Sequence, residues 1–404
     1  MKGEKTQARR RSPLLAVLLI LIAIAVIFFG FQLKEVWELE AMRQAAFEQL
    51  EWMHALPNEY GSYWDAQVCK GLSDRFIVCE SRSGESDKGM VDDKGDLIIP
   101  CEYRDIRSDF SEGLSVACKN VRETENEGGR LTDFGFIDAG GKPVIDFQYD
   151  WAWDFLGEYA GVVKGEKALI IDKAGAVVFA LPEDADFVCR TARDSGQFIF
   201  SREGKQGVMN IEGKVLLAAE YEEVFPQSEG FTLVRQGREW RFFDEAYRPA
   251  FGGAVFTEAK PFSEGLAAVR LGLDRGYIDH SGELVLEVKC LELASFSEGL
   301  AWVRVNNKVV SVIDQKGAAI IENIAAVGNG EFGGDYGEPR FCDGLLAFRG
   351  KNGKIGYLDS RGRIMIPPVF DYARDFEDGW AEVTVNGGDP RRGLIRRPAE
   401  PVVY

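Results

Sequence analysis

A short phrase recurs along most of this chain of 404 residues: a glycine, an apolar pair, an aspartate, two variable positions and a second glycine. The clearest copies are GMVDDKG at 89–95, GFIDAGG at 135–141, GYIDHSG at 276–282 and GYLDSRG at 356–362. Weaker copies bring the total to about nine, and most neighbours lie 34 to 38 residues apart. Such a period indicates one repeated supersecondary unit. Because a unit of this size cannot bury enough apolar surface alone, the copies must pack on one another.

The Asp-x-x-Gly part of each copy lies between two apolar runs, which is typical of a tight hairpin turn. Aspartate starts such a turn by bonding to its own backbone, and glycine accepts the positive φ that completes a bulged loop. Because the copies share these residues, we interpret them as turn-forming and not as metal ligands or catalytic acids. In the clearest copies they are Asp92, Gly95, Asp138, Gly141, Asp279, Gly282, Asp359 and Gly362.

A second phrase lies between these copies, clearest as FSEGLSV at 110–116, FSEGLAA at 262–268 and FSEGLAW at 296–302. We interpret it as a further strand, which gives three strands in each unit and a short fourth in some. The repeat region is therefore expected to be all-β, with about nine three- to four-stranded units in a propeller-like ring. An open or solenoid-like array is the alternative, because nine exceeds the usual range of roughly 4–8 blades.

These phrases resemble the WG repeat family, whose units are similar to WGYIDxxGKxVIPPxYDxAxxFxEGLAxV. The closest stretch is GYLDSRGRIMIPPVFDYARDFEDGWAEV at 356–383. Other residues replace the tryptophan before most of the glycines, and Trp240 remains only where the glycine has become Arg241. The resemblance covers about residues 70–404. It implies a bacterial repeat protein with a binding or scaffolding role and no shared catalytic motif.

The N-terminal region has a different character. Residues 1–12 are basic, and no charged residue occurs from 13 to 33. An uncharged apolar stretch of this length predicts a transmembrane helix at 13–33, and the basic tail 1–12 is expected to stay in the cytoplasm. A cleaved signal peptide is the alternative. Residues 34–58 carry an apolar stripe at helical spacing, which predicts a helical stalk before the repeat domain at 59–404.

The composition excludes several kinds of chemistry. The chain has 48 Lys+Arg against 65 Asp+Glu, and the formal charge of −17 disfavours a nucleic-acid-binding surface. Its two histidines are too few for multi-histidine metal sites and for most histidine-based catalysis. The seven cysteines form no C-x-x-C pair and are interpreted as buried thiols, although disulfides stay open. We therefore expect no metal, no cofactor and no nucleic-acid partner.

Departures from the repeat are the best candidates for binding, because loops on a rigid scaffold carry function. One glycine-rich insertion contains Phe332, Asp335, Tyr336 and Glu338, aromatic and acidic residues that suit a sugar or a basic peptide. A plain surface loop is the alternative for this segment. A second candidate is the pair Trp151 and Trp153, which shares one strand face and forms either a ligand platform or part of the core.

The sequence thus predicts a single-pass cell-membrane protein whose C-terminal repeat domain lies outside the cytoplasm. That domain is expected to bind or scaffold a protein or a cell-envelope ligand, and its acidic field favours basic peptides or cations. The alternative is a carbohydrate-active enzyme that uses two carboxylates on a β-repeat scaffold. No pair of carboxylates stands out among the repeats, so we do not expect an enzyme.

Overall fold

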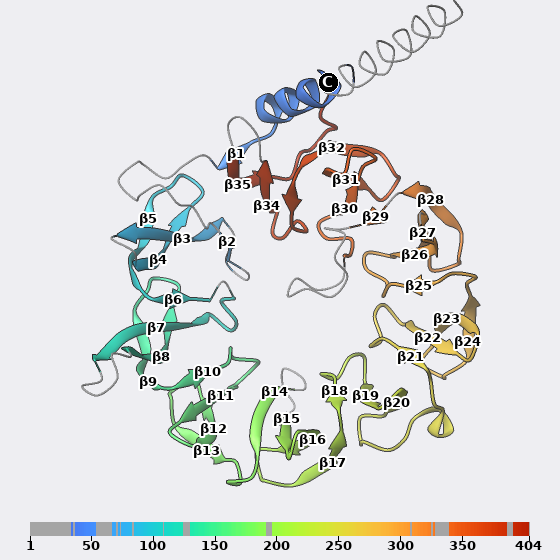
Figure 1. Ribbon diagram of the computed structural model, residues 1–404. Helices are drawn as coiled ribbons and strands as arrows, with labels where there is room; N and C mark the ends of the chain where they lie inside the picture. Colours follow the sequence, from blue (N-terminus) through green and yellow to red (C-terminus); the bar gives the residue numbers. More distant parts are fainter. Residues whose placement is uncertain are drawn as a thin grey trace, which may run out of the picture.

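A computed structural model describes residues 34, 37–53, 67–69, 72, 74–82, 85–107, 109–123, 130–190, 196–307, 309–324, 326–327, 339–385 and 391–403. In this part of the chain, nine small antiparallel sheets are arranged as the blades of one ring (Figure 1). Eight sheets have four strands and one has three. The structure is therefore a nine-bladed β-propeller, and the open or solenoid-like alternative was wrong.

The first blade contains β2 (Gln67–Val68), β3 (Arg75–Arg82), β4 (Glu85–Asp92) and β5 (Leu97–Tyr103). The second contains β6 (Asp105–Ile106), β7 (Leu114–Glu123), β8 (Arg130–Asp138) and β9 (Pro143–Tyr149). The third contains β10 (Trp151–Ala152), β11 (Tyr159–Lys164), β12 (Lys167–Asp172) and β13 (Val177–Ala180). The fourth contains β14 (Asp186–Arg190), β15 (Gln197–Arg202), β16 (Lys205–Asn210) and β17 (Val215–Tyr221). The fifth contains β18 (Glu223–Val224), β19 (Thr232–Gln236) and β20 (Glu239–Phe243), followed by the 3₁₀ turn η2 (Phe251–Gly253).

The sixth blade contains β21 (Glu258–Ala259), β22 (Ala267–Leu271), β23 (Asp274–Ile278) and β24 (Leu284–Glu287). The seventh contains β25 (Glu292–Leu293), β26 (Leu300–Asn306), β27 (Val309–Asp314) and β28 (Ala319–Ile324). The eighth contains β29 (Ala326–Val327), β30 (Leu345–Arg349), β31 (Ile355–Asp359) and β32 (Ile364–Phe370). The ninth contains β33 (Tyr372–Ala373), β34 (Trp380–Val385) and β35 (Arg391–Arg396), and its fourth strand is β1 (Trp52–Met53).

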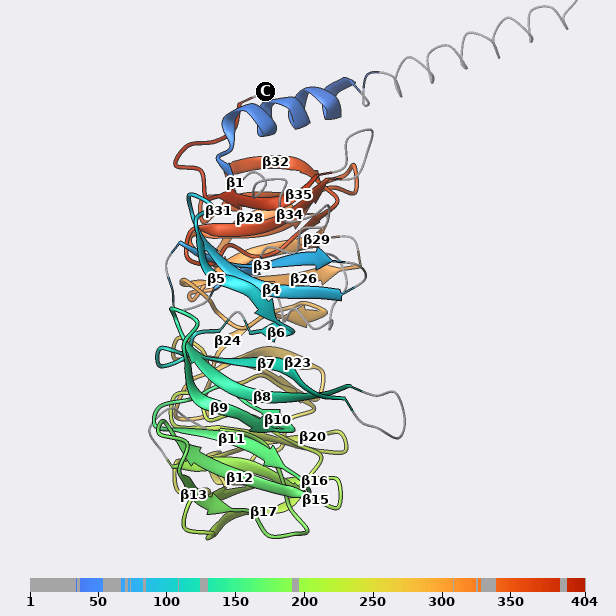
Figure 2. The ribbon, with the colours of Figure 1, turned by 90° about the vertical axis from the view of Figure 1, so that its left-hand side faces the viewer.

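Each blade begins with a short strand near the centre of the ring and continues outward to the rim (Figure 1). Because successive strands are antiparallel, the hairpin between the second and third strands and the link to the next blade lie on one face of the ring, the hairpin face. The turns between strands one and two and between strands three and four lie on the other, the turn face. Figure 2 shows the ring edge-on, with its two faces to either side of the blades.

The Asp-x-x-Gly turns join the third and fourth strands. In the first blade, the Asp92 carboxylate accepts hydrogen bonds from the backbone N–H of Lys94 at 3.0 Å and of Asp96 at 2.9 Å. These bonds to the charged form lower the pKa of Asp92. Gly95 completes the turn with a φ of 84°. The same carboxylate bonds occur in the turns of Asp138, Asp172, Asp244, Asp279, Asp314 and Asp359.

The first glycine of the phrase has a different physical reason. At Gly356 on β31, a Cβ atom would lie 2.5 Å from the backbone oxygen of Ile366 on the outer strand β32. The strand register shifts at this point, so the two backbones approach closely. Gly89, Gly135, Gly207 and Gly276 make the same close approach to their own outer strands. At these five positions glycine lets the fourth strand approach the third closely.

The Ser-Glu-Gly phrase forms a turn, where the sequence suggested a continuous strand. Glu264 has a positive φ of 56°, and the strand β22 begins only at Ala267. The Glu264 carboxylate accepts a hydrogen bond from the N–H of Gly299 in the next blade at 2.8 Å, and the Ser263 hydroxyl donates to the backbone oxygen of Phe296 at 2.7 Å. Equivalent carboxylate bonds join blades five to six, seven to eight and eight to nine. The phrase therefore forms a turn whose side chains make hydrogen bonds to the neighbouring blade.

The ring is closed by its two chain ends. Trp52 and Met53 in β1 pair with Ile395 and Leu394 in β35, so the N-terminal segment supplies the outer strand of the ninth blade. Between the ninth and first blades, the rings of Trp380 and Phe76 lie 5.1 Å apart, edge to face.

Polar contacts reinforce this closure. The indole N–H of Trp380 donates to Asp74 at 3.3 Å. Arg396 lies 3.7 Å from Asp74 and 3.2 Å from Glu51. Arg396 therefore connects the last strand both to the first blade and to the segment before β1.

A helix precedes β1 and spans residues 37–49. Its residues Ala45 and Ala46, and Leu50 just after it, are buried against Met365 and Phe370 of β32. Figures 1 and 2 show the helix at the rim, beside the last blades. In the predicted stalk 34–58, the described residues 37–53 therefore belong to the propeller and not to a separate element before it, since the helix packs on the eighth blade and β1 pairs in the ninth.

The expected tail 1–12 and transmembrane helix 13–33 lie outside the described residues. Within the described part of the chain, none of the helical segments has the length and apolar character needed to cross a bilayer.

Replacing Trp52 with alanine should weaken ring closure. This side chain is buried and contacts Phe47 at 5.2 Å and Phe370 at 6.3 Å between ring centroids. Truncating a buried tryptophan costs about 3–5 kcal/mol, so urea unfolding of Trp52→Ala should show a loss of that order. Trp37→Ala is the control, because Trp37 is 75% exposed and should change little. Equal stability of both variants would contradict the closure by β1.

Gly356→Ala should be destabilising by about 1–3 kcal/mol, because the added Cβ forces the outer strand away from β31. Gly140→Ala is the matched control, since the nearest atom to its Cβ is 3.4 Å away. Chemical unfolding of the two variants beside the native chain measures the difference. If Gly140→Ala proved the more harmful, the close approach of the strands would not be the reason for Gly356.

Candidate functional site

The fifth blade is the irregular member of the ring. It has three strands, whereas its neighbours have four. Arg241 occupies the position that Gly356 and its four counterparts hold in their blades, and after β20 the chain forms η2 in place of a fourth strand. Trp240 keeps part of the ladder, because its N–H and backbone oxygen both bond to Phe256 at 2.9 Å. Phe251 of η2 then packs under Gly282 of the sixth blade, so the contact between the blades is preserved.

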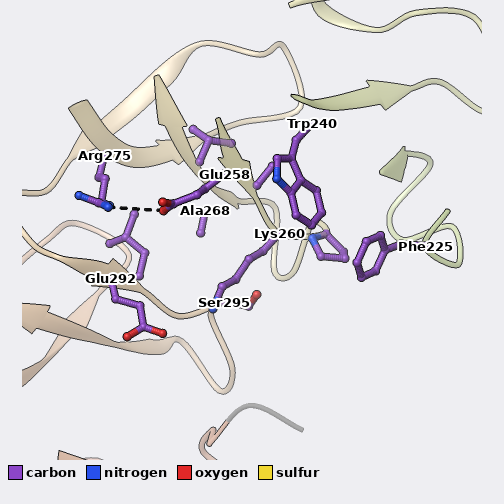
Figure 3. Close-up of a pocket in the computed structure, with 12 residues that line it drawn as sticks. Phe225, Trp240, Glu258, Lys260, Ala268, Arg275, Glu292 and Ser295 are labelled. Carbon is purple, nitrogen blue, oxygen red and sulfur yellow. Dashed lines mark ion pairs between the residues drawn. The ribbon is translucent and has the colours of Figure 1, made fainter. Parts of the chain in front are cut away.

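A pocket of about 440 Å³ lies beside this irregular blade and is lined by residues of blades five, six and seven (Figure 3). Phe225 and Trp240 form an aromatic wall, with ring centroids 5.7 Å apart. Ala259, Pro261, Ala268, Val269 and Leu293 provide the remaining apolar lining. The volume falls in the range of about 300–1,000 Å³ that is typical of small-ligand sites.

Most of the polar lining is charged, and both of its carboxylates contact arginines in or beside the pocket. Glu258 lies 2.8 Å from Arg270 and 3.5 Å from Arg275. Glu292 pairs with Arg304 at 3.0 Å. Lys260 extends past Ser295, and its ammonium lies 5.8 Å from the ring centroid of Trp302 (Figure 3). The pocket thus combines an aromatic wall with hydrogen-bonding groups whose charges are largely balanced.

The candidate loop predicted from the sequence lies outside the described residues. This holds for Phe332, Asp335, Tyr336 and Glu338, which the chain places between β29 and β30. The segment that follows them is well connected: the Trp302 indole donates to the backbone oxygen of Pro339 at 2.7 Å. The proposed role of the loop in binding stays a prediction.

Trp151 and Trp153 lie in the third blade, away from the pocket. Their rings contact each other edge to face, with centroids 6.3 Å apart and planes at 76°, so they do not present one flat platform. Trp153 packs against Phe187 of the fourth blade at 4.8 Å and belongs to the contact between blades. Trp151 is exposed and lies beside Phe134 and the guanidinium of Arg107.

Among the residues that the structure describes, two carboxyl groups have a raised pKa, the property expected of a catalytic acid. Burial raises the pKa of Asp154, although Arg107 at 3.4 Å opposes this effect. Burial also raises the pKa of Asp375 to about 6, with Arg340 acting against it and Glu377 adding to it. Asp154 belongs to the third blade and Asp375 to the ninth, which are not neighbours, so the two do not form one site.

The described residues contain no cluster of three or more metal-ligating side chains. Burial raises the pKa of Cys69 to about 12 and of Cys118 and Cys189 to about 11, which keeps these thiols protonated at neutral pH. Cys69 and Cys118 are buried, as expected from the sequence, and Cys189 is half-buried.

Comparison with known proteins supports the repeat assignment. Segments of the chain match the family described as WG containing repeat at residues 89–120, 134–167, 207–240, 254–272, 276–308 and 355–388. These matches cover parts of blades one to nine, including β20 with Trp240. The chain therefore carries WG-type repeats. No curated protein matches it significantly.

Several solved structures are weakly similar. The crystal structure of BamB from Moraxella catarrhalis has 10% identity and a TM-score of 0.41, covering 70% of this chain and 94% of that one. The designed protein Ika8 has 12% identity and a TM-score of 0.39, covering 72% and 95%. A eukaryotic initiation factor has 10% identity and a TM-score of 0.43, covering 86% and 94%. Similarity at this level does not bear on function.

Sequence reasoning missed the pocket residues Phe225, Glu258, Lys260, Arg275 and Glu292. They come from three different repeats and occupy ordinary repeat positions. One signal was present, because Trp240 with Arg241 departs from the repeat pattern at the position where the pocket lies.

Asp375 should make the stability of the protein depend on pH. Because the pKa is about 6 in the folded chain and 3.8 ordinarily, the folded state holds the proton more tightly than the unfolded state. The stability that this residue contributes is complete below about pH 4 and is lost as the pH rises to about 6. Asp375→Asn should therefore gain stability over the native chain at pH 7 but not at pH 4, by thermal unfolding at both values.

The exposed Asp93 provides a control for this measurement. Asp93→Asn should follow the native chain at both pH values. A gain at pH 7 in both variants would point to the general relief of negative charge and not to the burial of Asp375.

Proposed function

We propose that this protein is a non-enzymatic binding module in which the pocket of blades five to seven holds part of a protein ligand. The observation that carries the proposal is the location of the pocket. It lies where the repeat is irregular, beside Trp240, and it joins an aromatic wall to charged groups from two further blades. Aromatic anchors and a few well-placed polar groups are typical of binding pockets.

The sequence of residues 1–33 supports a display of this propeller outside the cytoplasm by a membrane anchor. Such an anchor would attach to the ring at the place where the chain closes it, because the helix packs beside the last blades and β1 is the outer strand of the ninth blade. The ring would then face its ligand as a rigid body. A carbohydrate-active enzyme receives less support, because the two carboxyls with a raised pKa lie in separate blades.

Affinity capture with the full chain tests the proposal. Immobilised protein is exposed to detergent-solubilised envelope of the source cells, and bound proteins are identified by mass spectrometry. Trp240→Ala and the pocket-filling Ser295→Phe should each lose the specific partner. Trp37→Ala, far from the pocket at the exposed end of the helix, should retain it. Thermal unfolding shows that each variant is folded. Retention of the same partners by both pocket variants would remove the pocket from the proposed function.

A further inference from the structure

Exposed apolar side chains are unevenly distributed on this ring. Most of the large exposed apolar side chains lie on the outer strands at the rim, one or two in each of several blades; Leu97, Val144 and Val285 are examples. Two others lie at the ends of the described chain. All the remaining large exposed apolar side chains of the described residues lie on the hairpin face. They are Trp151, Val255, Leu271, Leu273, Leu291 and Val305.

Five of these six, all except Trp151, gather at blades six and seven. We call Val255, Leu271, Leu273, Leu291 and Val305 the apolar patch. Leu271 and Leu273 form the tip of the hairpin between β22 and β23, and Leu273 is 90% exposed. Val255 lies in the link that reaches this hairpin, because Thr257 donates its N–H to Arg270 at 3.0 Å.

The same arrangement is repeated one blade further. Leu291 donates its N–H to the backbone oxygen of Arg304 at 2.7 Å, which places it beside Val305. Arg275 connects the two halves of the patch: it lies 3.5 Å from Glu258 in one blade and donates to the backbone oxygen of Cys290, next to Leu291, at 3.3 Å. Since Arg275, Glu258 and Glu292 also line the pocket, the patch and the pocket adjoin.

The arginines around the patch each contact a glutamate. Arg270 and Arg275 both contact Glu258, and Arg304 contacts Glu292. In the adjoining fifth blade, Arg235 lies 2.9 Å from Glu222 and 3.1 Å from Glu223. A basic ligand would have to compete with these arginines for the carboxylates. This face therefore differs from the chain as a whole, which carries a formal charge of −17.

We propose that the apolar patch and the adjoining pocket dock an uncharged, apolar segment of a protein partner, with one large apolar side chain seated against Phe225 and Trp240. This inference rests on the proposed function and names the class of its ligand. Burial of the aliphatic side chains supplies the attraction, and the arginine–glutamate pairs form a polar rim that offers hydrogen bonds without a net charge. The acidic field of the rest of the ring discourages acidic partners.

A random peptide library displayed on phage and selected on the immobilised full chain tests this chemistry. The selected peptides should be poor in charged residues and should share an aromatic or large aliphatic position. Their affinity, measured by calorimetry, should change little between low and high salt, because exposed charges contribute little to it. Enrichment of lysine- and arginine-rich peptides whose binding weakens with salt would overturn the proposal in favour of a basic ligand.

Paired variants locate the contact. Leu273→Asp should weaken the selected peptides by about tenfold or more, the effect of losing an interface anchor. Val285→Asp is the matched control, an exposed aliphatic residue of the same blade that lies on the outer strand β24, and it should leave affinity unchanged. Equal effects of the two substitutions would overturn the assignment to the patch.

Two outcomes of these binding measurements separate this inference from the proposed function. If Trp240→Ala abolishes binding but Leu273→Asp does not, the pocket binds and the patch plays no part. If neither variant matters, the proposed function fails as well. Analytical sedimentation of the native chain and of Leu273→Asp tests whether a second copy of the chain occupies the patch. A native dimer that becomes a monomer in this variant would show that it does and would overturn the proposal.

Discussion

The fold depends on the contact between neighbouring blades, because a sheet of four short strands cannot cover its own faces. The apolar clusters accordingly run from one blade to the next. In one of them, Ile77 and Met90 of the first blade pack with Ile106 and Ile137 of the second. Ile99 of the first blade lies directly under Gly141 of the second, 2.9 Å from where a Cβ would be. The turn glycine thus serves both the backbone conformation of its own blade and the packing of the blade before it.

Much of this could be read from the sequence because it is repeated. The number of units, their β character and the position of the Asp-x-x-Gly turns all follow from local patterns. The closure could not be predicted. Trp52 and Met53 continue an apparently helical pattern, and only their pairing with Ile395 and Leu394 makes them a strand. The Ser-Glu-Gly phrase was read as a strand because its glutamate gives no local sign of a positive φ, which tertiary bonds to the next blade hold in place.

The pocket, too, could be predicted only in part, because some of its features follow from the local sequence and others from contacts between distant repeats. The change from glycine to Arg241 was visible in the sequence, and it lies in the one described blade that lacks a fourth strand. The sequence does not reveal that Glu258 and Glu292 lie beside Trp240, because they are separated from it by other repeat elements. Their ion pairs with arginines on neighbouring strands look like ordinary cross-strand pairs until the ring brings three blades together.

The pairing of β1 with β35 has a consequence for how the protein is made. Trp52 is among the first residues of the ring to be synthesised, and its partner Ile395 is among the last. Blades one to eight take all their described strands from continuous stretches of chain and can form in order as they emerge. The ninth cannot, and it pays the entropy of closing the longest loop in the molecule. Until β34 and β35 are synthesised, the helix at 37–49 and the edge of the first blade lack partners, so the nascent chain exposes apolar surface for longest at the point where the finished ring is joined.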